Sequence, residues 1–536
     1  MLDKKEKRKL RSSLFRHLDG IVTAPTAYLL KEKSVLDAIL QRKSVELTEL
    51  AKEFNANEAY LNVALRILAS QNWLVQEIDN KSNKIRFSIN ENSESAFKLS
   101  DLYADVIDLI KFSERFHRRK FKKAPFLKLK SIMAKYKEHY GLETAEEGSV
   151  EFQVLKHIEG LIVGPTIMSL GMSGMFHKYF LTSSFQAGEF HEDAESFKEL
   201  LDFFEWLGWF KKHNNNFSFT DTGLFFARRA SAYGVTVSYI PTLRHLDELI
   251  FGNPLKLRNS EGLSEEKHVD RAMNVWGSGG AHSAYFKKMD KVLIELFNQD
   301  IEDQPKGILD MGCGNGAFLI HAYNVIENRT LRGQMLEDHP LFLVGADYNE
   351  KALEITRSNI VQNEIWAKVI FGDIGRPEML AEELKQNYNI ELVDLLNVRT
   401  FLDHNRIWET VDQADPNYIS TSTGAFAFNG HRITNDLVEQ NLIRHFERWL
   451  PYVHKHGLLL IELHTVDPSI VAKNLGRTAV TAYDGTHGYS DQFILELDIF
   501  KEMARRAGFE FDDRYAYRFP DSELASVSIN LMRGKR

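Results

Sequence analysis

The sequence has only one cysteine, Cys313, among its 536 residues. A single thiol excludes an intrachain disulfide and any zinc site built on several cysteines. The sequence also lacks a run of about 18 apolar residues, so neither a membrane-spanning helix nor a membrane partner is expected. Its first residues, MLDKKEKRKLRSS, have the charge of a signal peptide without the apolar core that follows it. A cytoplasmic protein is therefore predicted.

Basic residues are also fewer than acidic ones. With 67 Lys and Arg against 75 Asp and Glu, the formal net charge is −8, which argues against bulk electrostatic binding to nucleic acid. Hydrophobic residues make up 43% and charged residues 26% of the chain, as in ordinary soluble proteins. At this length the chain is expected to fold into about three or four domains.

The most informative segment is KGILDMGCGNGAFLI, residues 306–320, in which an apolar strand leads through a glycine-rich turn into an apolar helix. Glycines at 312, 314 and 316 permit a sharp turn and a close approach of the backbone to a ligand. A second strand, LFLVGAD, ends in Asp347, a carboxylate suited to the two hydroxyls of a ribose. These features predict a nucleotide-type pocket like that of the dinucleotide-binding folds.

The letters of the turn, D-x-G-x-G-x-G, resemble motif I of the class I S-adenosylmethionine (SAM) methyltransferases. Two later segments agree. FGDI, residues 371–374, resembles the segment whose acid meets the adenine amine, and VDLLNVRTFLDH, residues 393–404, resembles the strand that ends beside the reactive methyl. The resemblance implies SAM as cofactor, held by Asp310, Gly312, Gly314, Gly316, Asp347, Tyr348, Asp373, Ile374 and Asn397.

The first half of the chain contains a duplication. LFRHLDGIVTAPTAYLL, from Leu14, aligns without gaps on VLKHIEGLIVGPTIMSL, from Val154, so that His17 falls on His157. Each copy continues into an amphipathic helix and a hairpin that ends in RFSIN or NFSFT, and the first copy has a helix-turn-helix pattern over residues 47–74. Two winged-helix-like domains are predicted, at 1–145 and 146–238.

A winged helix suggests DNA binding, but DNA docking needs a basic recognition helix. The first copy offers only Arg66 there, and the second is net acidic. No specific DNA binding is therefore expected. Small-molecule methyltransferases that these domains resemble use them for homodimerisation or as a roof over the active site. The basic run RFHRRKFKKAPFLKLK, residues 115–130, is either a solvated helix face or a dock for an acidic partner such as an acyl carrier protein.

Residues 239–303 are predicted to be a helical linker or lid. Glycines at 277, 279 and 280 lie between two helical patterns, so a flexible turn and a tight packing turn both fit, and the flexible lid is favoured. His282 and Tyr285 follow this turn and are expected to face the pocket. Residues 304–536 alternate strands with helices, which predicts an α/β, Rossmann-like domain whose parallel sheet ends in an antiparallel edge.

Polar residues follow the later strands of this domain, where ligands of such sheets gather. The fourth strand leads into Asp403, His404 and Asn405, and the fifth, GLLLIELHT, contains Glu462 and His464. A glycine-containing loop then supplies Asp484, His487, Asp491 and Gln492. Such groups suit either a first-row metal or a general base with an orienting acid. In contrast, His445 and the histidines at 454 and 456 are expected on surface helices and turns.

WGSGGAH, RTFLDHNR, ELHT and THGYSDQ together resemble the metal-dependent C-methyltransferases of polyketide loading modules. This resemblance implies metal-assisted methylation of a malonyl-type acyl group, with the carrier protein bound in trans because the chain has no carrier serine motif. The implied catalytic residues are His464, His487, His404 and His282, and the implied ligands of Mn²⁺ or Fe are Asp403, His464, His487 and Gln492. Two alternatives stay open: an O-methyltransferase with a His base, and a winged-helix regulator with a SAM-sensing domain.

Overall fold

The computed structural model describes residues 2–111, 123–142, 145–180, 184–258 and 267–535, and its chain divides into two compact units. The first comprises Met1–Ala281, Asn429–Arg432 and Asp467–Ser490; the second comprises His282–Phe428, Ile433–Val466 and Asp491–Arg536. The first eight residues of the basic run lie outside the described residues. None of the helices described is long and apolar enough to span a bilayer.

The first unit contains the predicted helix-turn-helix and wing. The helix-turn-helix pattern folds as α3 (Leu47–Glu53) and α4 (Glu58–Ser70), and the side chain of Asn57 caps α4. The wing is β2 (Val75–Asp79) paired with β3 (Lys84–Ser88), and β1 (Ser44–Glu46) adds a third strand. Two helices precede these elements in the sequence, α1 (Lys4–Glu32) and α2 (Val35–Arg42).

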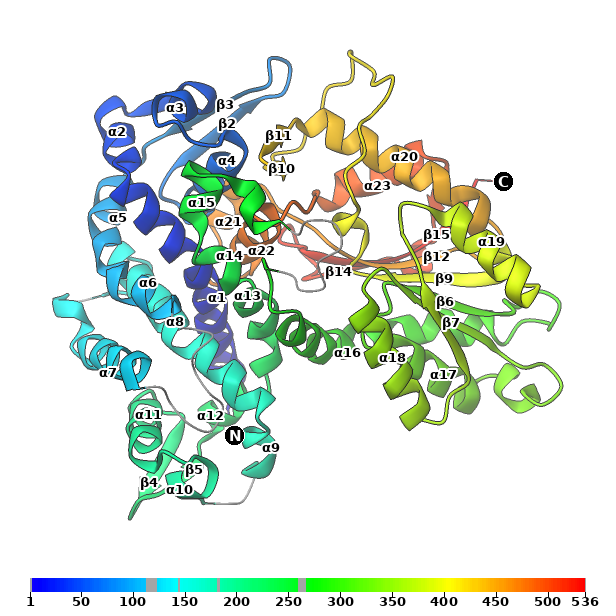
Figure 1. Cartoon of the computed structure of the whole chain (residues 1–536), viewed down its shortest axis with the longest axis horizontal. Coiled ribbons are helices and arrows are strands. Elements are labelled where there is room, and N and C mark those ends of the chain that lie inside the picture. The colour runs from blue at the N-terminus through cyan, green and yellow to red at the C-terminus, as the bar shows by residue number, and fades with distance from the viewer. Residues whose placement is uncertain (1, 112–122, 143–144, 181–183, 259–266, 536) are drawn as a thin grey trace. The chain divides into compact units, whose positions relative to one another are not determined.

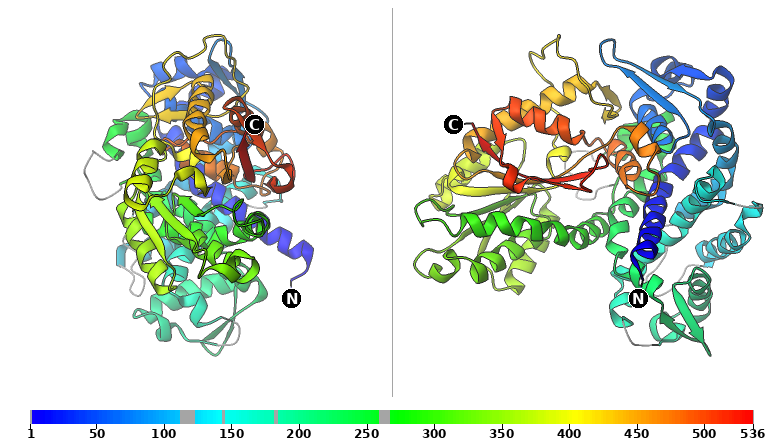
Figure 2. Two further views of the ribbon diagram at one scale, coloured as in Figure 1. Left: turned by 90° about the vertical axis from the view of Figure 1, so that its right-hand side faces the viewer. Right: turned by 180° about the vertical axis from the view of Figure 1, so that it is seen from behind.

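The second copy repeats this arrangement with α8 (Val150–Met172), α11 (Ala194–Trp206) and the hairpin β4 (Phe210–His213)–β5 (Asn216–Phe219). The long helices α1 and α8 of the two copies lie side by side (Figures 1 and 2). They approach so closely that a Cβ on Gly20 would lie 2.2 Å from the Cα of His157, and one on Gly160 would lie 2.4 Å from the carbonyl oxygen of His17. The aligned glycine and histidine of each copy therefore meet across one crossing.

The two histidines of this crossing are fully buried and symmetrically bonded. The Nδ1 of His17 lies 2.8 Å from the hydroxyl of Tyr233, and the Nδ1 of His157 lies 2.8 Å from the hydroxyl of Tyr103. Each histidine thus bonds a tyrosine of the other copy. The exchange of equivalent contacts explains why the H-x-x-G pattern recurs in both copies.

The predicted glycine turn near residue 278 is wrong. A single helix, α16 (Arg271–Leu296), runs through all three glycines. Within the first unit, Gly277 lies against Gly234 at the start of α13 (Gly234–Ser238), and a Cβ on Gly277 would come within 2.5 Å of the Cα of Gly234. The glycines therefore permit close packing of a continuous helix, and neither the flexible turn nor the tight packing turn that the sequence suggested is present.

The second unit is built on an eight-stranded sheet, which confirms the predicted Rossmann-like fold with an antiparallel edge. Its strand order is β13-β15-β12-β9-β6-β7-β8, and β14 also pairs with β15. The parallel strands are β6 (Gly307–Met311), β7 (Phe342–Asp347), β8 (Ala367–Phe371), β9 (Leu395–Thr400) and β12 (Leu458–Leu463). The antiparallel strands are β13 (Phe509–Phe511), β14 (Tyr517–Phe519) and β15 (Val527–Gly534).

Helices cover both faces of this sheet (Figure 1). On one face the core joins Leu309 and Val344 of the strands to α19 (Pro377–Tyr388), α20 (Asn435–Val453) and α23 (Leu497–Arg506). On the other face lie α17 (Ala317–Arg329) and α18 (Glu350–Gln362). Because the central strands are buried on both faces, their sequences are almost entirely apolar. A polar residue within them, such as Asp310 or Arg399, therefore needs a specific explanation.

Candidate active site

The glycine turn at the end of β6 has the backbone shape that the sequence predicts. Gly312, Gly314 and Gly316 have φ angles of +78°, +56° and +75°, which other residues rarely adopt. The turn is anchored to β7, because the amide of Gly312 donates to the carbonyl of Ala346 at 2.7 Å. At Gly314 a Cβ would meet no described atom within 4 Å. The turn therefore has open space where a ligand would approach its backbone.

Asp347, at the end of β7, is held against this turn. One carboxylate oxygen accepts a hydrogen bond from the amide of Gly314 at 3.0 Å, and the other accepts one from the amide of Asn349 at 2.9 Å. These bonds orient the carboxylate. A carboxylate oxygen retains a second lone pair for a ligand hydroxyl, as the ribose prediction requires.

Asp310 is the second carboxylate of the site, and its environment is unusual for an acidic residue. It is 1% exposed, and neither of its oxygens has a hydrogen-bond partner among the described residues. Burial, with a smaller contribution from the charge of Asp347, raises the pKa of Asp310 to about 8. A buried carboxylate without partners is costly unless a ligand supplies them. The ammonium group of SAM has the charge and the donors that this carboxylate lacks.

The other predicted SAM residues lie in three kinds of environment. Tyr348 and Phe371 form an exposed aromatic pair with ring centroids 5.3 Å apart. The carboxylate of Asp373 accepts from the amide of Gly375 at 2.8 Å. In contrast, the side chain of Ile374 packs in the core, so a contact to cofactor would come from its backbone. The buried amide of Asn397 donates to the carbonyl of Leu395 at 3.1 Å, in the interior of the sheet.

A histidine–glutamate pair lies at the ends of β9 and β12. The Nδ1 of His404 is 2.5 Å from a carboxylate oxygen of Glu462, and both side chains are buried. Glu462 also accepts hydrogen bonds from the amides of Asp403 and Leu463, at 2.8 and 2.7 Å. If Nδ1–H donates to the carboxylate, the lone pair of the imidazole is on Nε2. This is the geometry of an oriented general base.

The loop that carries His404 touches the glycine turn. Leu402 lies over Gly312, because a Cβ on Gly312 would be only 2.9 Å from the Cδ2 of Leu402. The turn at the end of β6 and the pair at the ends of β9 and β12 thus share the carboxyl edge of adjacent strands. The predicted cofactor site and the candidate base are therefore neighbours within one compact unit.

Asp403 is tied into a second buried network. Its Oδ1 lies 2.5 Å from Nη1 of Arg399 and 2.9 Å from Nε2 of His445. Burial opposes its ionisation, but the charge of Arg399 and the bond from His445 outweigh burial and lower the pKa of Asp403 to about 2. The guanidinium of Arg399 also lies 4.0 Å from the ring centre of Trp449. This network braces the segment that carries His404.

The surface assignment of His445 and His456 is wrong, since each is only 6% exposed. The sequence did not point to Arg399, and it indicated Glu462 only as one of several possible metal ligands or orienting acids. A signal for both was present, because each is a charged residue inside an otherwise apolar strand and so needs a buried partner. His445 had no comparable local signal.

The predicted metal ligands are divided between the two compact units. The Nε2 of His464 is 2.7 Å from the Ser528 hydroxyl and its Nδ1 is 3.2 Å from the carbonyl of Leu495, so both ring nitrogens are engaged. His487 belongs to the first unit, on α22 (Val480–Gly488), where its Nδ1 lies 2.9 Å from the carbonyl of Tyr483. Gln492 is buried in the second unit.

Because both ring nitrogens of His464 are bonded, this residue does not fit the predicted ligand set. Among the described residues no group of three or more His, Cys, Asp and Glu is arranged to hold a metal.

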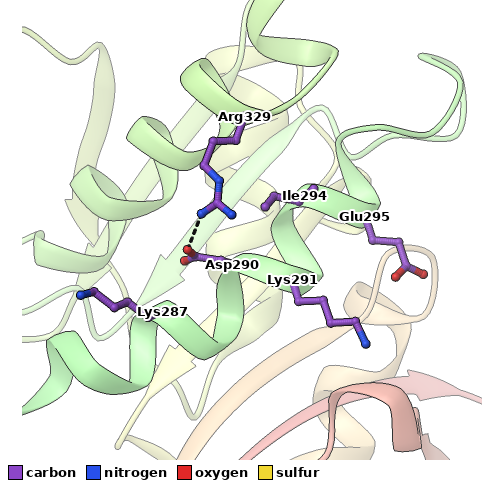
Figure 3. Close-up of a pocket in the computed structure, with 6 residues that line it drawn as sticks. All are labelled: Lys287, Asp290, Lys291, Ile294, Glu295 and Arg329. Atoms are coloured by element: carbon purple, nitrogen blue, oxygen red, sulfur yellow. Dashed lines mark hydrogen bonds and ion pairs between the residues drawn. The ribbon is translucent and has the colours of Figure 1, made fainter.

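A separate concavity of about 550 Å³ lies on α16 and α17. Its lining contains Lys287, Asp290, Lys291 and Arg329, and Arg329 pairs with Asp290 at 2.7 Å. Figure 3 shows the two lysines pointing in different directions rather than toward a common centre. None of its lining residues belongs to the glycine turn or to the His404–Glu462 pair. This concavity is therefore distinct from the candidate site described above.

Three family models match the chain in succession. The AprA N-terminal domain matches residues 10–76, the AprA winged helix domain matches 159–253, and the AprA MT2-like domain matches 266–530. No curated protein matches the chain.

Several solved methyltransferase structures match the chain at low similarity. Human N-acetylserotonin methyltransferase in complex with SAM is 12% identical with a TM-score of 0.41, covering 73% of this chain and 100% of its own. The mitomycin 7-O-methyltransferase MmcR is 11% identical with a TM-score of 0.40, at 72% and 98% coverage. The CurJ carbon methyltransferase is 12% identical with a TM-score of 0.32, at 70% and 92% coverage.

These likenesses are too distant to carry an argument about the site. The assignment rests on the family models together with the sheet and the glycine turn described above. The chain therefore belongs to the AprA MT2-like methyltransferases and is a class I SAM-dependent methyltransferase with AprA-type N-terminal and winged-helix domains.

Proposed function

We propose that this enzyme methylates a small-molecule or carrier-bound acceptor of natural-product biosynthesis, and that His404 removes the acceptor's proton. The observation that carries the proposal is the 2.5 Å distance between Nδ1 of His404 and the carboxylate of Glu462. His404 lies on the loop whose Leu402 touches the glycine turn. Glu462 holds the ring in one tautomer and stabilises the imidazolium that forms when Nε2 takes the proton.

The residues of the site divide the work of the reaction. SAM supplies an electrophilic methyl group and leaves as the neutral thioether. Asp347 and the glycine turn hold the ribose and the amino-acid end of the cofactor, and Asp310 binds its ammonium group. His404 accepts the proton from the acceptor, whose electron pair then forms the new bond to the methyl carbon as the methyl–sulfur bond breaks. Leu402 and the buried surroundings of Glu462 limit access of water to the pair.

We further propose that the acceptor is a carbon acid, such as a malonyl-type or other β-carbonyl acyl group. An imidazole base suits a proton between two carbonyl groups, and the resemblance to loading-module C-methyltransferases points to the same class. O-methylation is the second candidate. It is favoured by the His404–Glu462 pair itself, which deprotonates a hydroxyl without any further group.

Metal assistance remains a separate prediction. Both ring nitrogens of His464 are already bonded, which does not fit the four-residue ligand set, so no step above passes through a metal.

The test is methyl transfer from SAM to two acceptor types: malonyl-loaded carrier protein, and phenolic small molecules. Products are identified by mass spectrometry, with excess chelator in half of the reactions. We expect a carbon-methylated acyl product that forms equally well with chelator. Methylation of phenols alone would establish the O-methyltransferase alternative. Loss of activity in chelator, restored by Mn²⁺ or Fe²⁺, would support the metal prediction and contradict the mechanism written here.

SAM binding should depend on pH through Asp310. A pKa of about 8 leaves this group largely protonated at pH 6, whereas the bound ammonium favours the carboxylate. Binding must then release a proton, so affinity should rise by up to about tenfold per pH unit toward pH 8. Calorimetry at pH 6, 7 and 8 would measure this, with Asp310→Asn as the control expected to lose the dependence. Equal wild-type affinity at all three values would contradict it.

The raised pKa of Asp310 has the opposite effect on the stability of the cofactor-free protein. The folded-state pKa lies above the ordinary value of 3.8, so folding favours the protonated form of Asp310. Its contribution to stability is present at low pH and is lost as the pH rises through about 8. Cofactor binding and stability of the empty protein should therefore respond oppositely to pH at this residue.

The winged-helix copies are expected to bind no specific DNA, which argues against the regulator alternative. Arg66, the only basic residue of α4, is 2% exposed and its Nε lies 2.9 Å from the carboxylate of Asp484. A buried, paired guanidinium does not contact phosphates. A mobility-shift assay with random and genomic fragments at physiological salt should show no specific complex. A sequence-specific complex with a dissociation constant near 10⁻⁸ M or tighter would support the regulator.

A further inference from the structure

Phe401 has an unusual backbone in a position next to the chemistry. It is the first residue after β9, and its φ angle is +58°. A bulky residue in this left-handed region is a conformational outlier, and such outliers cluster at functional sites. Its amide donates to the carbonyl of Ile461 at 2.7 Å, which anchors this conformation to β12. The fold therefore maintains an unfavourable backbone in order to place this ring.

The ring of Phe401 belongs to a cluster of four aromatic side chains. It stacks on His282 of α16, with ring centroids 4.4 Å apart and planes inclined by 24°. Tyr285 meets Phe401 edge-on at 5.9 Å and meets Phe519 at 5.2 Å. All four side chains are only partly buried. Their rings therefore remain partly accessible.

This cluster adjoins the glycine turn. Leu402, the residue after Phe401, lies over Gly312, and ligands of such sheets bind at this carboxyl edge. Burial lowers the pKa of His282 to about 4, so its imidazole is uncharged at neutral pH. A stack of two uncharged rings attracts a cation, because the ring faces carry negative electrostatic potential.

We propose that the stacked rings of Phe401 and His282 bind the sulfonium of SAM and thereby favour SAM over the neutral product, S-adenosylhomocysteine. The inference rests on the proposed placement of SAM at the glycine turn. It assigns to His282 a stacking and positioning role in place of proton transfer. The charge of the sulfonium distinguishes the substrate from the product, which is otherwise almost identical in shape.

The experiment measures dissociation constants for SAM and for S-adenosylhomocysteine by calorimetry. Phe401→Leu removes the aromatic face while keeping an apolar side chain. We expect its affinity for SAM to fall by about 3- to 30-fold, the range of cation–π interactions at partly desolvated sites, and its affinity for the product to change less than about twofold. Phe401→Tyr, which keeps the ring, should retain the wild-type ratio of the two constants.

A second variant tests the role of His282. His282→Phe keeps a ring in the stack but cannot accept a proton, so it should retain the wild-type ratio of the two dissociation constants. Equal weakening of SAM and product binding in Phe401→Leu would overturn the inference, as would a ratio of the two constants in His282→Phe that falls to the value of Phe401→Leu. Failure of the wild-type enzyme to bind either ligand would instead overturn the proposed function together with the inference.

Discussion

Replacing His404 with alanine should reduce methyl transfer by about 10²–10⁴-fold, the usual contribution of a general base, while SAM affinity stays within about twofold. The two effects should separate because the proposed SAM-binding groups, the glycine turn and Asp347, follow other strands than the base does. Single-turnover transfer from labelled SAM would measure the rate, and calorimetry the affinity. Full activity in His404→Ala would contradict the proposed mechanism.

Two further variants sharpen this result. Glu462→Gln keeps the size of the side chain but presents an amide that can donate to Nδ1, which stabilises the wrong tautomer of His404. Its turnover should therefore fall nearly as far as that of His404→Ala. The exposed His454, whose Nδ1 lies 2.9 Å from the carbonyl of Pro451, offers a matched control, and His454→Ala should behave as wild type.

Replacing Gly314 with valine should abolish measurable SAM binding. The residue has a φ of +56°, and the space beside it is free of described atoms. A valine would be strained there and would place its branched side chain where the cofactor lies. Gly141 is a matched control, since its φ is +75° and no described atom lies near its Cβ position either. Gly141→Val bears similar strain in the first unit and outside the glycine turn, so SAM binding should survive.

Asp347→Ala should weaken SAM binding by about 1.5–3 kcal/mol, the range for hydrogen bonds to a charged group. The variant loses the ribose acceptor and also the two bonds that orient the turn, from Gly314 and Asn349. Calorimetry on folded protein, checked by thermal unfolding, would measure the loss. Wild-type affinity in both Asp347→Ala and Gly314→Val would refute the location of the cofactor.

Local patterns in the sequence predicted much of the fold. The apolar strand, the glycine turn and the terminal acid of the next strand were recognisable because each depends on a few neighbouring residues. The same holds for the helix-turn-helix at α3 and α4 and for the two hairpins. The glycines near 278 were misjudged because a glycine that breaks a helix and one that packs against Gly234 look alike in sequence.

The candidate site was predictable only in part. That polar residues would follow β9 and β12 came from the sequence, and the structure brings His404 and Glu462 together there. Which polar residue pairs with which is a matter of strand register and side-chain direction. His464 is two residues beyond Glu462, yet its ring bonds Ser528 on β15, and His487 folds with the first unit.

The sequence by itself determined the class of enzyme, the cofactor turn and the duplicated N-terminal region, because these rest on motifs whose residues are close together along the chain. The tertiary structure alone decided that Glu462 orients His404, that Arg399 and His445 bind Asp403, and that Phe401 stacks on His282. Those partners are far apart in sequence. Their contacts exist because parallel strands bring their carboxyl ends to one edge, where buried charges and rings must find each other.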